Sequence, residues 1–243
     1  MKDRADKLLV SLGHFDSRAG ARAAIEAGRV TANGVTVAKP SQMLSSEDVI
    51  LAEAAHPYVS RGGLKLAHAL EAFGVDPAGR HCLDIGASTG GFTDVLLRAG
   101  AVHVTAIDVG REQLHASLRG HPRVTSLEAQ DARTLTAAML PAPPSLLVCD
   151  ASFIGLEKLL DVPLSLAAAG ADLVGLFKPQ FQVGRAHVGK GGLVTDAAAT
   201  ERAADAFAEW MNEKGWPIHA WTASPISGGD GNAERLFHAV RAQ

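Results

Sequence analysis

Charged side chains follow several apolar runs of this sequence at the points where strands would end. They are Asp84, Asp108, Asp131, Asp150 and Lys178. One aspartate in such a place is an ordinary helix cap or turn residue. Parallel strands, however, end at the same edge of a sheet, so four carboxylates and one lysine there indicate a site for a ligand or a reaction.

The lysine of this group is expected in a partly buried place. Lys178 directly follows the apolar run over 173–177, where partial burial disfavours its charged form unless an acid pairs with it. Asp150 is the expected partner, because the strands that end at these two residues should be neighbours. The competing interpretation is a buried ion pair with no chemical role.

A glycine-rich loop lies beside the first of these acids. Residues 83–92 read Leu-Asp-Ile-Gly-Ala-Ser-Thr-Gly-Gly-Phe, and the glycines at Gly86, Gly90 and Gly91 allow a sharp turn that comes close to a ligand. Their spacing does not match the dinucleotide-binding motif, and no Lys-Ser/Thr pair follows as in a phosphate-binding loop. With Asp84 ahead of the first glycine, the loop favours a cationic ligand without phosphate.

The acids fit different parts of one small molecule. Asp108 lies 24 residues after Asp84, near the spacing at which an acid meets ribose hydroxyls in nucleotide-binding folds. Asp131 could face an adenine amino group, and Asp84 could hold an amino-acid ammonium through water or backbone. S-adenosylmethionine carries all these groups, and we predict it over a nicotinamide dinucleotide. Its predicted binding residues are Asp84, Gly86, Ser88, Gly90, Gly91, Phe92, Asp108, Asp131 and Asp150.

The elements that must position these residues alternate along the chain. Strands are expected over 81–85, 102–107, 124–127, 146–149, 173–177, 218–224 and 235–240, and helices over 92–98, 112–118, 156–168 and 196–214. A further helix begins after Ser60-Arg-Gly-Gly and ends at Gly74. This alternation predicts an α/β domain with a seven-stranded, mostly parallel sheet covered by helices on both faces.

The start of the chain has a different pattern. Helices are expected over 4–12 and 18–27, followed by a hairpin whose turn is Asn33-Gly34. A polar stretch and Pro57 then mark a domain boundary. We therefore expect a small α+β domain over 1–56 and the larger domain over 57–243.

Basic residues of the small domain could form a phosphate-binding surface, although a solvated helix face is the simpler reading of charge alone. Arg4-Ala-Asp-Lys-Leu-Leu, Ser17-Arg18, Gly28-Arg29-Val30, Asn33-Gly34 and Lys39-Pro-Ser resemble the RNA-binding domain named after small-subunit ribosomal protein four. The resemblance covers residues 4–44 and implies RNA binding. The expected RNA-binding residues are Arg4, Lys7, Arg18, Arg22, Arg29, Lys39 and Arg61.

Composition narrows the class of protein. The formal net charge is −3, so any basic surface must be local, and 47% apolar with 20% charged residues is typical of soluble globular chains. We expect no membrane-spanning segment, because Asp172 interrupts the best apolar run. The only cysteines, Cys82 and Cys149, read as buried reduced thiols, which favours the cytoplasm. No metal site is expected, and the oligomeric state is left open.

Four distant charged residues carry a second resemblance. Lys65, Asp150, Lys178 and Glu234 resemble the Lys-Asp-Lys-Glu tetrad of FtsJ-type ribose 2′-O-methyltransferases. With the glycine-rich loop, Phe177-Lys-Pro-Gln-Phe and Gly231-Asn-Ala-Glu, the chain resembles the TlyA family from end to end. That resemblance implies a Rossmann-like class I methyltransferase, dependent on S-adenosylmethionine, that methylates ribose in ribosomal RNA, often at cytidine. Ribosomal RNA or ribosomal subunits are the expected partners.

The tetrad suggests how such a reaction would proceed. The sulfonium already supplies an activated carbon and a leaving group, so the protein must align a ribose hydroxyl and help its proton depart. Lys178 is the candidate for that help, either as a neutral base or as a cation that stabilises the alkoxide. Asp150 would orient Lys178, while Lys65 and Glu234 would position the ribose.

Three alternatives remain at this stage. A base methyltransferase is disfavoured, because Asp150-Ala-Ser-Phe lacks the two prolines of amino-group methylases and Cys149 points away from Asp150 on an extended strand. A non-catalytic RNA-binding assembly factor would not need the tetrad. A membrane-acting haemolysin, a name that members of the family have carried, would need a spanning segment or a basic amphipathic helix.

Overall fold

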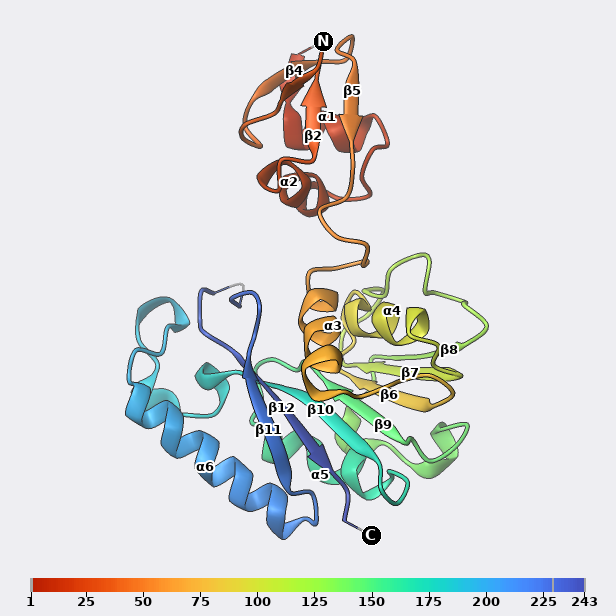
Figure 1. The fold of residues 1–243 in the computed structure, drawn as a ribbon, viewed down its shortest axis with the longest axis vertical. Coiled ribbons are helices and arrows are strands. Elements are labelled where there is room, and N and C mark those ends of the chain that lie inside the picture. Colours follow the sequence, from red (N-terminus) through yellow and green to blue (C-terminus); the bar gives the residue numbers. More distant parts are fainter. Residues whose placement is uncertain (1, 229, 243) are drawn as a thin grey trace. The chain divides into compact units, whose positions relative to one another are not determined.

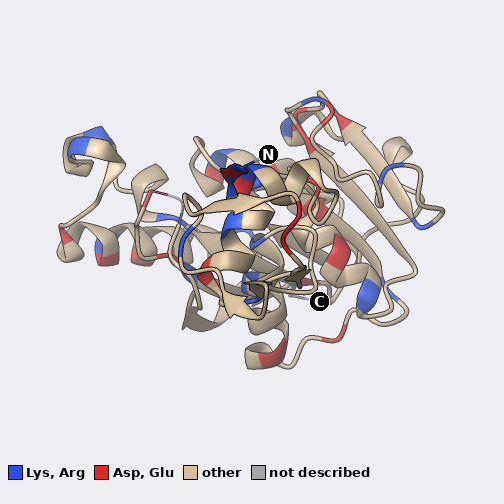
Figure 2. Cartoon of the chain, turned by 90° about the horizontal axis from the view of Figure 1, so that it is seen from above, with Lys and Arg blue, Asp and Glu red and all other residues tan. Residues whose placement is uncertain are grey.

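The computed structural model describes residues 2–228 and 230–242 and divides the chain into two compact units (Figure 1). One unit runs up to Pro57 and the other begins at Tyr58. The boundary expected from the sequence, between residues 56 and 57, lies one residue earlier. Lysines and arginines are interspersed with acidic residues along the ribbon (Figure 2), in keeping with the net charge of −3.

The first unit packs two helices against short strands. Its helices are α1 (Ala5–Ser11) and α2 (Arg18–Glu26), and its strands are β1 (Lys2–Arg4), β2 (Val30–Ala32), β3 (Val35–Thr36), β4 (Met43–Ser45) and β5 (Ile50–Ala52). The predicted hairpin is β2–β3, and its turn residues Asn33 and Gly34 both have positive φ, as this turn type requires. The pairings of β1 with β4 and of β2 with β5 were not predicted from the sequence.

The second unit is built on a seven-stranded sheet. Its strands are β6 (His81–Ile85), β7 (His103–Asp108), β8 (Val124–Glu128), β9 (Leu146–Cys149), β10 (Asp172–Phe177), β11 (Ile218–Ala223) and β12 (Arg235–Val240), in the order β11-β12-β10-β9-β6-β7-β8. Strands β6 to β10 pair in parallel, and β12 pairs antiparallel with β10 and β11. The predicted mostly parallel sheet is confirmed.

Helices cover both faces of this sheet (Figure 1). On one face, α3 (Gly62–Phe73) and α4 (Gly91–Arg98) bury apolar side chains with Cys82 and Val148. On the other face, α5 (Leu156–Ser165) and α6 (Ala197–Glu213) pack with Leu83 and Cys149. Successive residues of β6 and β9 thus enter opposite cores, as expected for strands buried on both sides.

The prediction of a helix over 112–118 is wrong, because this segment forms a series of bends and turns. Glu112 has a positive φ of 53°, which does not fit an α-helix. The Glu128 side chain of β8 also accepts hydrogen bonds from the backbone N–H groups of Glu112, Gln113 and Leu114. A carboxylate distant in the sequence therefore replaces the helical hydrogen bonds.

Candidate active site

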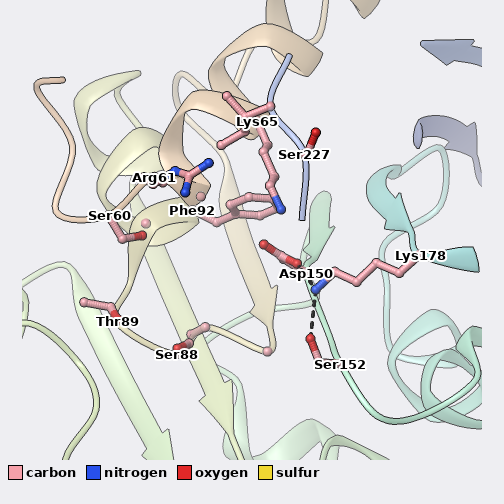
Figure 3. Close-up of a pocket in the computed structure, with 15 residues that line it drawn as sticks. Ser60, Arg61, Lys65, Ser88, Thr89, Phe92, Asp150, Ser152, Lys178 and Ser227 are labelled. Atoms are coloured by element: carbon pink, nitrogen blue, oxygen red, sulfur yellow. Dashed lines mark hydrogen bonds and ion pairs between the residues drawn. The ribbon is translucent and has the colours of Figure 1, made fainter. Parts of the chain in front are cut away.

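The four tetrad residues meet in the second unit as two ion pairs. Lys178, directly after β10, places its Nζ 2.5 Å from Oδ1 of Asp150, which directly follows β9. Lys178 also donates a hydrogen bond of 2.9 Å to Ser152 Oγ (Figure 3). Lys65 of α3 lies 2.6 Å from the Glu234 carboxylate, which immediately precedes β12.

The side chains of these ion pairs are largely shielded from solvent. Lys65, Lys178 and Glu234 are buried, with 8%, 7% and 5% of their surfaces exposed. Removing one partner of a buried pair leaves an uncompensated charge and costs about 3–5 kcal/mol. The pairing therefore fixes both ammonium groups in one geometry.

The glycine-rich loop passes directly over the end of β9. Gly86 has φ of +80°, and a side chain there would bring its Cβ within 3.0 Å of the Asp150 carbonyl oxygen. Gly90 has φ of +93°, and its Cβ would lie 2.4 Å from Leu118 Cδ1, so these two positions accept only glycine. The positive φ values agree with the sharp turn expected from the sequence, and the loop brings backbone close to Asp150.

Asp84 sits behind this loop and is fully buried. Burial raises the pKa of Asp84 to about 7, although a hydrogen bond from Thr93 Oγ1 at 2.6 Å opposes that rise. Its other oxygen, Oδ1, has no hydrogen-bond partner among the described residues. Asp84 does not line the cavities described next, so any role in cofactor binding would act through the loop, as the sequence-based prediction allowed.

Three cavities meet around Ser152. The central cavity, about 280 Å³, lies between the glycine-rich loop and the lysines (Figure 3). The apolar cavity, about 560 Å³, is lined by Ile85, Ile107, Ile154 and Leu159 with Asp108 and Asp131. The outer cavity, about 480 Å³, is lined by Phe153, Gln180, Asp230 and both tetrad lysines. Because Lys65 and Lys178 line the central and outer cavities alike, they stand between two spaces.

Seven of the nine predicted cofactor-binding residues line the first two cavities, whereas Asp84 and Gly90 line neither. Gly86, Ser88, Gly91, Phe92 and Asp150 line the central cavity, and Gly86, Ser88, Asp108, Asp131 and Asp150 line the apolar one. Asp108 accepts hydrogen bonds from the backbone N–H groups of Ser88 and Gly110 at 2.8 and 2.7 Å. Arg133 pairs with Asp131 at 2.6 Å, and its hydrogen bond lowers the pKa of Asp131.

Sequence reasoning missed several residues at this site, among them Ser152, Gln180 and Asp230. Another is the aromatic residue Phe153. Its side chain is 91% exposed, and its φ of +68° is rare for a bulky residue and typical of strain at functional sites. Its ring lies 5.3 Å from that of Phe181, and it lines both the apolar and the outer cavities. The available signal was an aromatic residue three positions after Asp150, the acid that follows β9.

The predicted RNA-binding residues of the first unit are partly engaged in ion pairs. Arg4 and Arg18 both pair with Asp6, at 2.9 and 2.7 Å, and Arg4 holds the pKa of that buried carboxyl well below its usual value. Lys7 pairs with Asp3 and Arg29 with Glu53. Arg18, Lys7 and Arg29 nevertheless keep more than half of their side-chain surface exposed, and Arg22 and Lys39 are exposed as well.

Arg61 differs from the other predicted RNA-binding residues, because it belongs to the second unit and lines the central cavity (Figure 3). Within the described ranges, no group of three or more His, Cys, Asp or Glu side chains could hold a metal ion. None of the described helices has the length and apolar character needed to cross a membrane.

Comparison with known families agrees with this geometry. An FtsJ-like methyltransferase family model matches residues 58–241, and an S4 domain model matches residues 3–50. The chain is 45% identical to the 16S/23S rRNA (cytidine-2′-O)-methyltransferase TlyA of Mycobacterium tuberculosis, over 99% of this chain and 90% of that protein. It is 38% identical to Hemolysin A of Brachyspira hyodysenteriae, over 98% and 99% of the two chains.

A solved structure gives the same result. A hemolysin-named protein of Streptococcus thermophilus superposes with a TM-score of 0.78 and 36% identity, over 100% of this chain and 89% of that one. Methyltransferases with lower identity, such as NodS of Bradyrhizobium japonicum with a TM-score of 0.51 and 14% identity, share the fold of the second unit. The resemblance noted in the sequence is confirmed, and the chain belongs to the FtsJ-like methyltransferases, in the TlyA group that carries an S4 domain ahead of the methyltransferase domain.

Proposed function

We propose that this protein methylates a ribose 2′-hydroxyl of ribosomal RNA with S-adenosylmethionine as the methyl donor. One observation carries the proposal: Lys178, paired with Asp150, lines both the central cavity next to the glycine-rich loop and the outer cavity. A donor in one space and a sugar in the other would meet at Lys178. The family to which the chain belongs supports the same reaction.

The residues around the first two cavities fit S-adenosylmethionine. The apolar cavity is lined by aliphatic side chains such as Ile107 and Leu159, which suit an adenine ring, and by the polar side chain of Asp108. The tight backbone at Gly86 leaves room for the remainder of the cofactor in the central cavity. When bound, the cofactor supplies a methyl group on a sulfonium, which is at once an activated carbon and a good leaving group.

The protein's own contribution is to orient the hydroxyl and deal with its proton. Lys178 is held by Asp150 and Ser152, so its Nζ has a fixed position next to the central cavity. From there it can accept the proton of the hydroxyl or stabilise the negative charge that forms on its oxygen. The Lys65–Glu234 pair, which also lines the outer cavity, would hold the ribose for attack in line with the bond that breaks.

Ribosomal RNA is the substrate that the rest of the chain favours. The first unit, which matches the S4 domain, exposes Arg18, Arg22 and Lys39, and these side chains suit a phosphate backbone. Phe153 offers an exposed aromatic face on which an unstacked base can lie. The TlyA proteins of Mycobacterium tuberculosis and Campylobacter jejuni are both named as cytidine-2′-O-methyltransferases of rRNA. A cytoplasmic location follows from this substrate.

Methylation of a pyrimidine carbon would need a different group. That reaction uses a cysteine thiolate as nucleophile, and burial raises the pKa of Cys149 to about 12. The Cys149 side chain also packs in the core with Leu83 and Phe177 rather than at the cavities. The site therefore favours an oxygen of the sugar over a carbon of the base.

The chemical form of the product tests the proposal. Purified protein is incubated with methyl-labelled S-adenosylmethionine and ribosomal subunits from cells that lack this modification, and the RNA is then hydrolysed with alkali. A 2′-O-methyl group blocks cleavage at its own nucleotide, so we expect the label in alkali-resistant dinucleotides. Label in mononucleotides would mean that a base is methylated and would overturn the proposal.

A further inference from the structure

The outer cavity has a polar wall that the reaction itself does not use. Gln180 donates a hydrogen bond of 2.8 Å from Nε2 to Oδ2 of Asp230, and both residues line this cavity together with Phe153. Neither residue belongs to the tetrad or to the predicted cofactor site. The wall therefore calls for a separate explanation.

The position of this wall relates it to the base of the substrate. In a nucleotide the base is joined to C1′, the carbon next to the one that bears the 2′-hydroxyl. If that hydroxyl reaches Lys178, the base must lie in a space that continues from the lysines, and the outer cavity is such a space. This step rests on the proposed function.

The wall is held in place by its neighbours. The Asn232 side chain is almost fully buried, accepts a hydrogen bond from the Val194 N–H and donates one to the Gly192 carbonyl, both at 2.9 Å. Its backbone N–H also donates to Oδ1 of Asp230 at 3.1 Å. Asn232 thereby joins the loop after β10 to the loop before β12, so the two sides of the cavity keep a fixed spacing.

The wall presents acceptors more than donors. Burial would raise the pKa of Asp230, but hydrogen bonds from Asn232 and Gln180 outweigh it and lower that pKa, so the group is a carboxylate. A carboxylate can accept further hydrogen bonds beyond these two. Oε1 of Gln180 is buried without a hydrogen-bond partner among the described residues, and Nε2 has a second N–H to donate.

We propose that Asp230 and Gln180 read the edge of the target base and admit cytosine while rejecting uracil. Cytosine carries an amino group, which donates to acceptors such as the Asp230 carboxylate, next to a ring nitrogen that accepts from the Gln180 amide. Uracil reverses both: its O4 faces the carboxylate and its N3–H faces a donor. Adenine shares the edge of cytosine, so this pair excludes uracil and guanine.

The size of the discrimination follows from the loss of these hydrogen bonds. One good pair of contacts to a base edge gives about 10- to 100-fold preference over the wrong base. The carboxylate adds repulsion of O4 to the loss of a partner, which is the usual way in which a site rejects a competitor.

The experiment compares two RNA substrates that differ only in the base at the target position, which is cytosine in one and uracil in the other. The cytidine methylated by the wild-type protein is mapped, and the same RNA is prepared with uridine at that position. We measure kcat/KM for the cytidine and the uridine RNA with the wild-type chain and with full-length Asp230→Asn and Gln180→Leu variants. Asp205→Asn in α6 is the matched surface control. Asp205 is exposed and lines none of the three cavities.

We expect the wild type and Asp205→Asn to prefer cytidine by about 10- to 100-fold. In Asp230→Asn the new amide can turn to donate to O4, so the preference should fall to near unity, and Gln180→Leu should lower it as well. Thermal melting identifies a variant that fails to fold, and the other variant then decides. If folded variants keep the wild-type preference for cytidine, the inference is overturned. If the wild type transfers no methyl group to the ribose of either RNA, the proposed function is overturned instead.

Discussion

Replacing Lys178 by alanine removes the one group that the proposed reaction places beside the departing proton. The ammonium lies 2.5 Å from Asp150 and 2.9 Å from Ser152, and the Lys178 side chain is only 9% exposed, so water would not reproduce its position. A positioned proton-transfer group contributes about 100- to 10,000-fold to a rate. In free energy this corresponds to about 3–5 kcal/mol of transition-state stabilisation.

The assay for Lys178→Ala separates the chemical step from binding. Transfer of labelled methyl groups to ribosomal RNA is measured in a single turnover with saturating RNA, and cofactor affinity is measured by calorimetry. We expect the rate to fall by about 100- to 10,000-fold. Cofactor affinity should be nearly unchanged, because Lys178 lines the central cavity but not the apolar cavity that we assign to the adenine ring. Lys158→Ala, which removes an exposed lysine of α5, is the matched control.

A second substitution distinguishes the two roles of this lysine. Arginine keeps the positive charge but is not deprotonated in proteins, so Lys178→Arg can stabilise an alkoxide and cannot act as a base. Substantial activity in Lys178→Arg would assign the role of a cation, and activity as low as in the alanine variant would assign that of a base. A rate for Lys178→Ala within tenfold of wild type would refute both roles.

The remaining predictions concern three other side chains. Lys65→Met should lower the free energy of unfolding by about 3–5 kcal/mol in urea titrations, and Lys65→Met with Glu234→Leu should recover most of it, because a buried charge is then no longer left alone. Burial raises the pKa of Asp84 in the folded protein to about 7 from an ordinary 3.8, so the wild type should lose stability as the pH rises from about 4 to 7. Asp84→Asn should lack this loss, and melting curves of both proteins at pH 5 and pH 8 can show the difference. Phe153→Ala should raise KM for RNA about tenfold with little change in kcat in steady-state transfer assays, since stacking of a base on an aromatic ring would be lost.

Much of the methyltransferase domain could be predicted from the sequence, because its signals are local. Apolar runs of strand length marked each strand of the sheet, and the residues that follow β9 and β10 proved to be neighbours, so the Lys178–Asp150 pair was predictable. The glycines at 86 and 90 likewise predicted a tight turn, since only glycine tolerates the observed positive φ and the close contacts that a Cβ would make there.

Other features depend on contacts between distant segments and gave no local signal. Lys65 and Glu234 are 169 positions apart, and only a family resemblance brought them together. The segment over 112–118 has the composition of a helix, but Glu128 captures its N–H groups. Similarly, the pairing of Arg18 with Asp6 follows from the packing of α1 against α2, which charge patterns alone do not reveal.

The central claim is that a sugar oxygen is the atom that receives the methyl group beside Lys178. The most direct test replaces the mapped target nucleotide by its 2′-deoxy form in an otherwise identical RNA and measures methyl transfer and RNA binding. We predict that transfer to this RNA is lost while binding is retained. Methyl transfer to the deoxy nucleotide at the wild-type rate would contradict the claim.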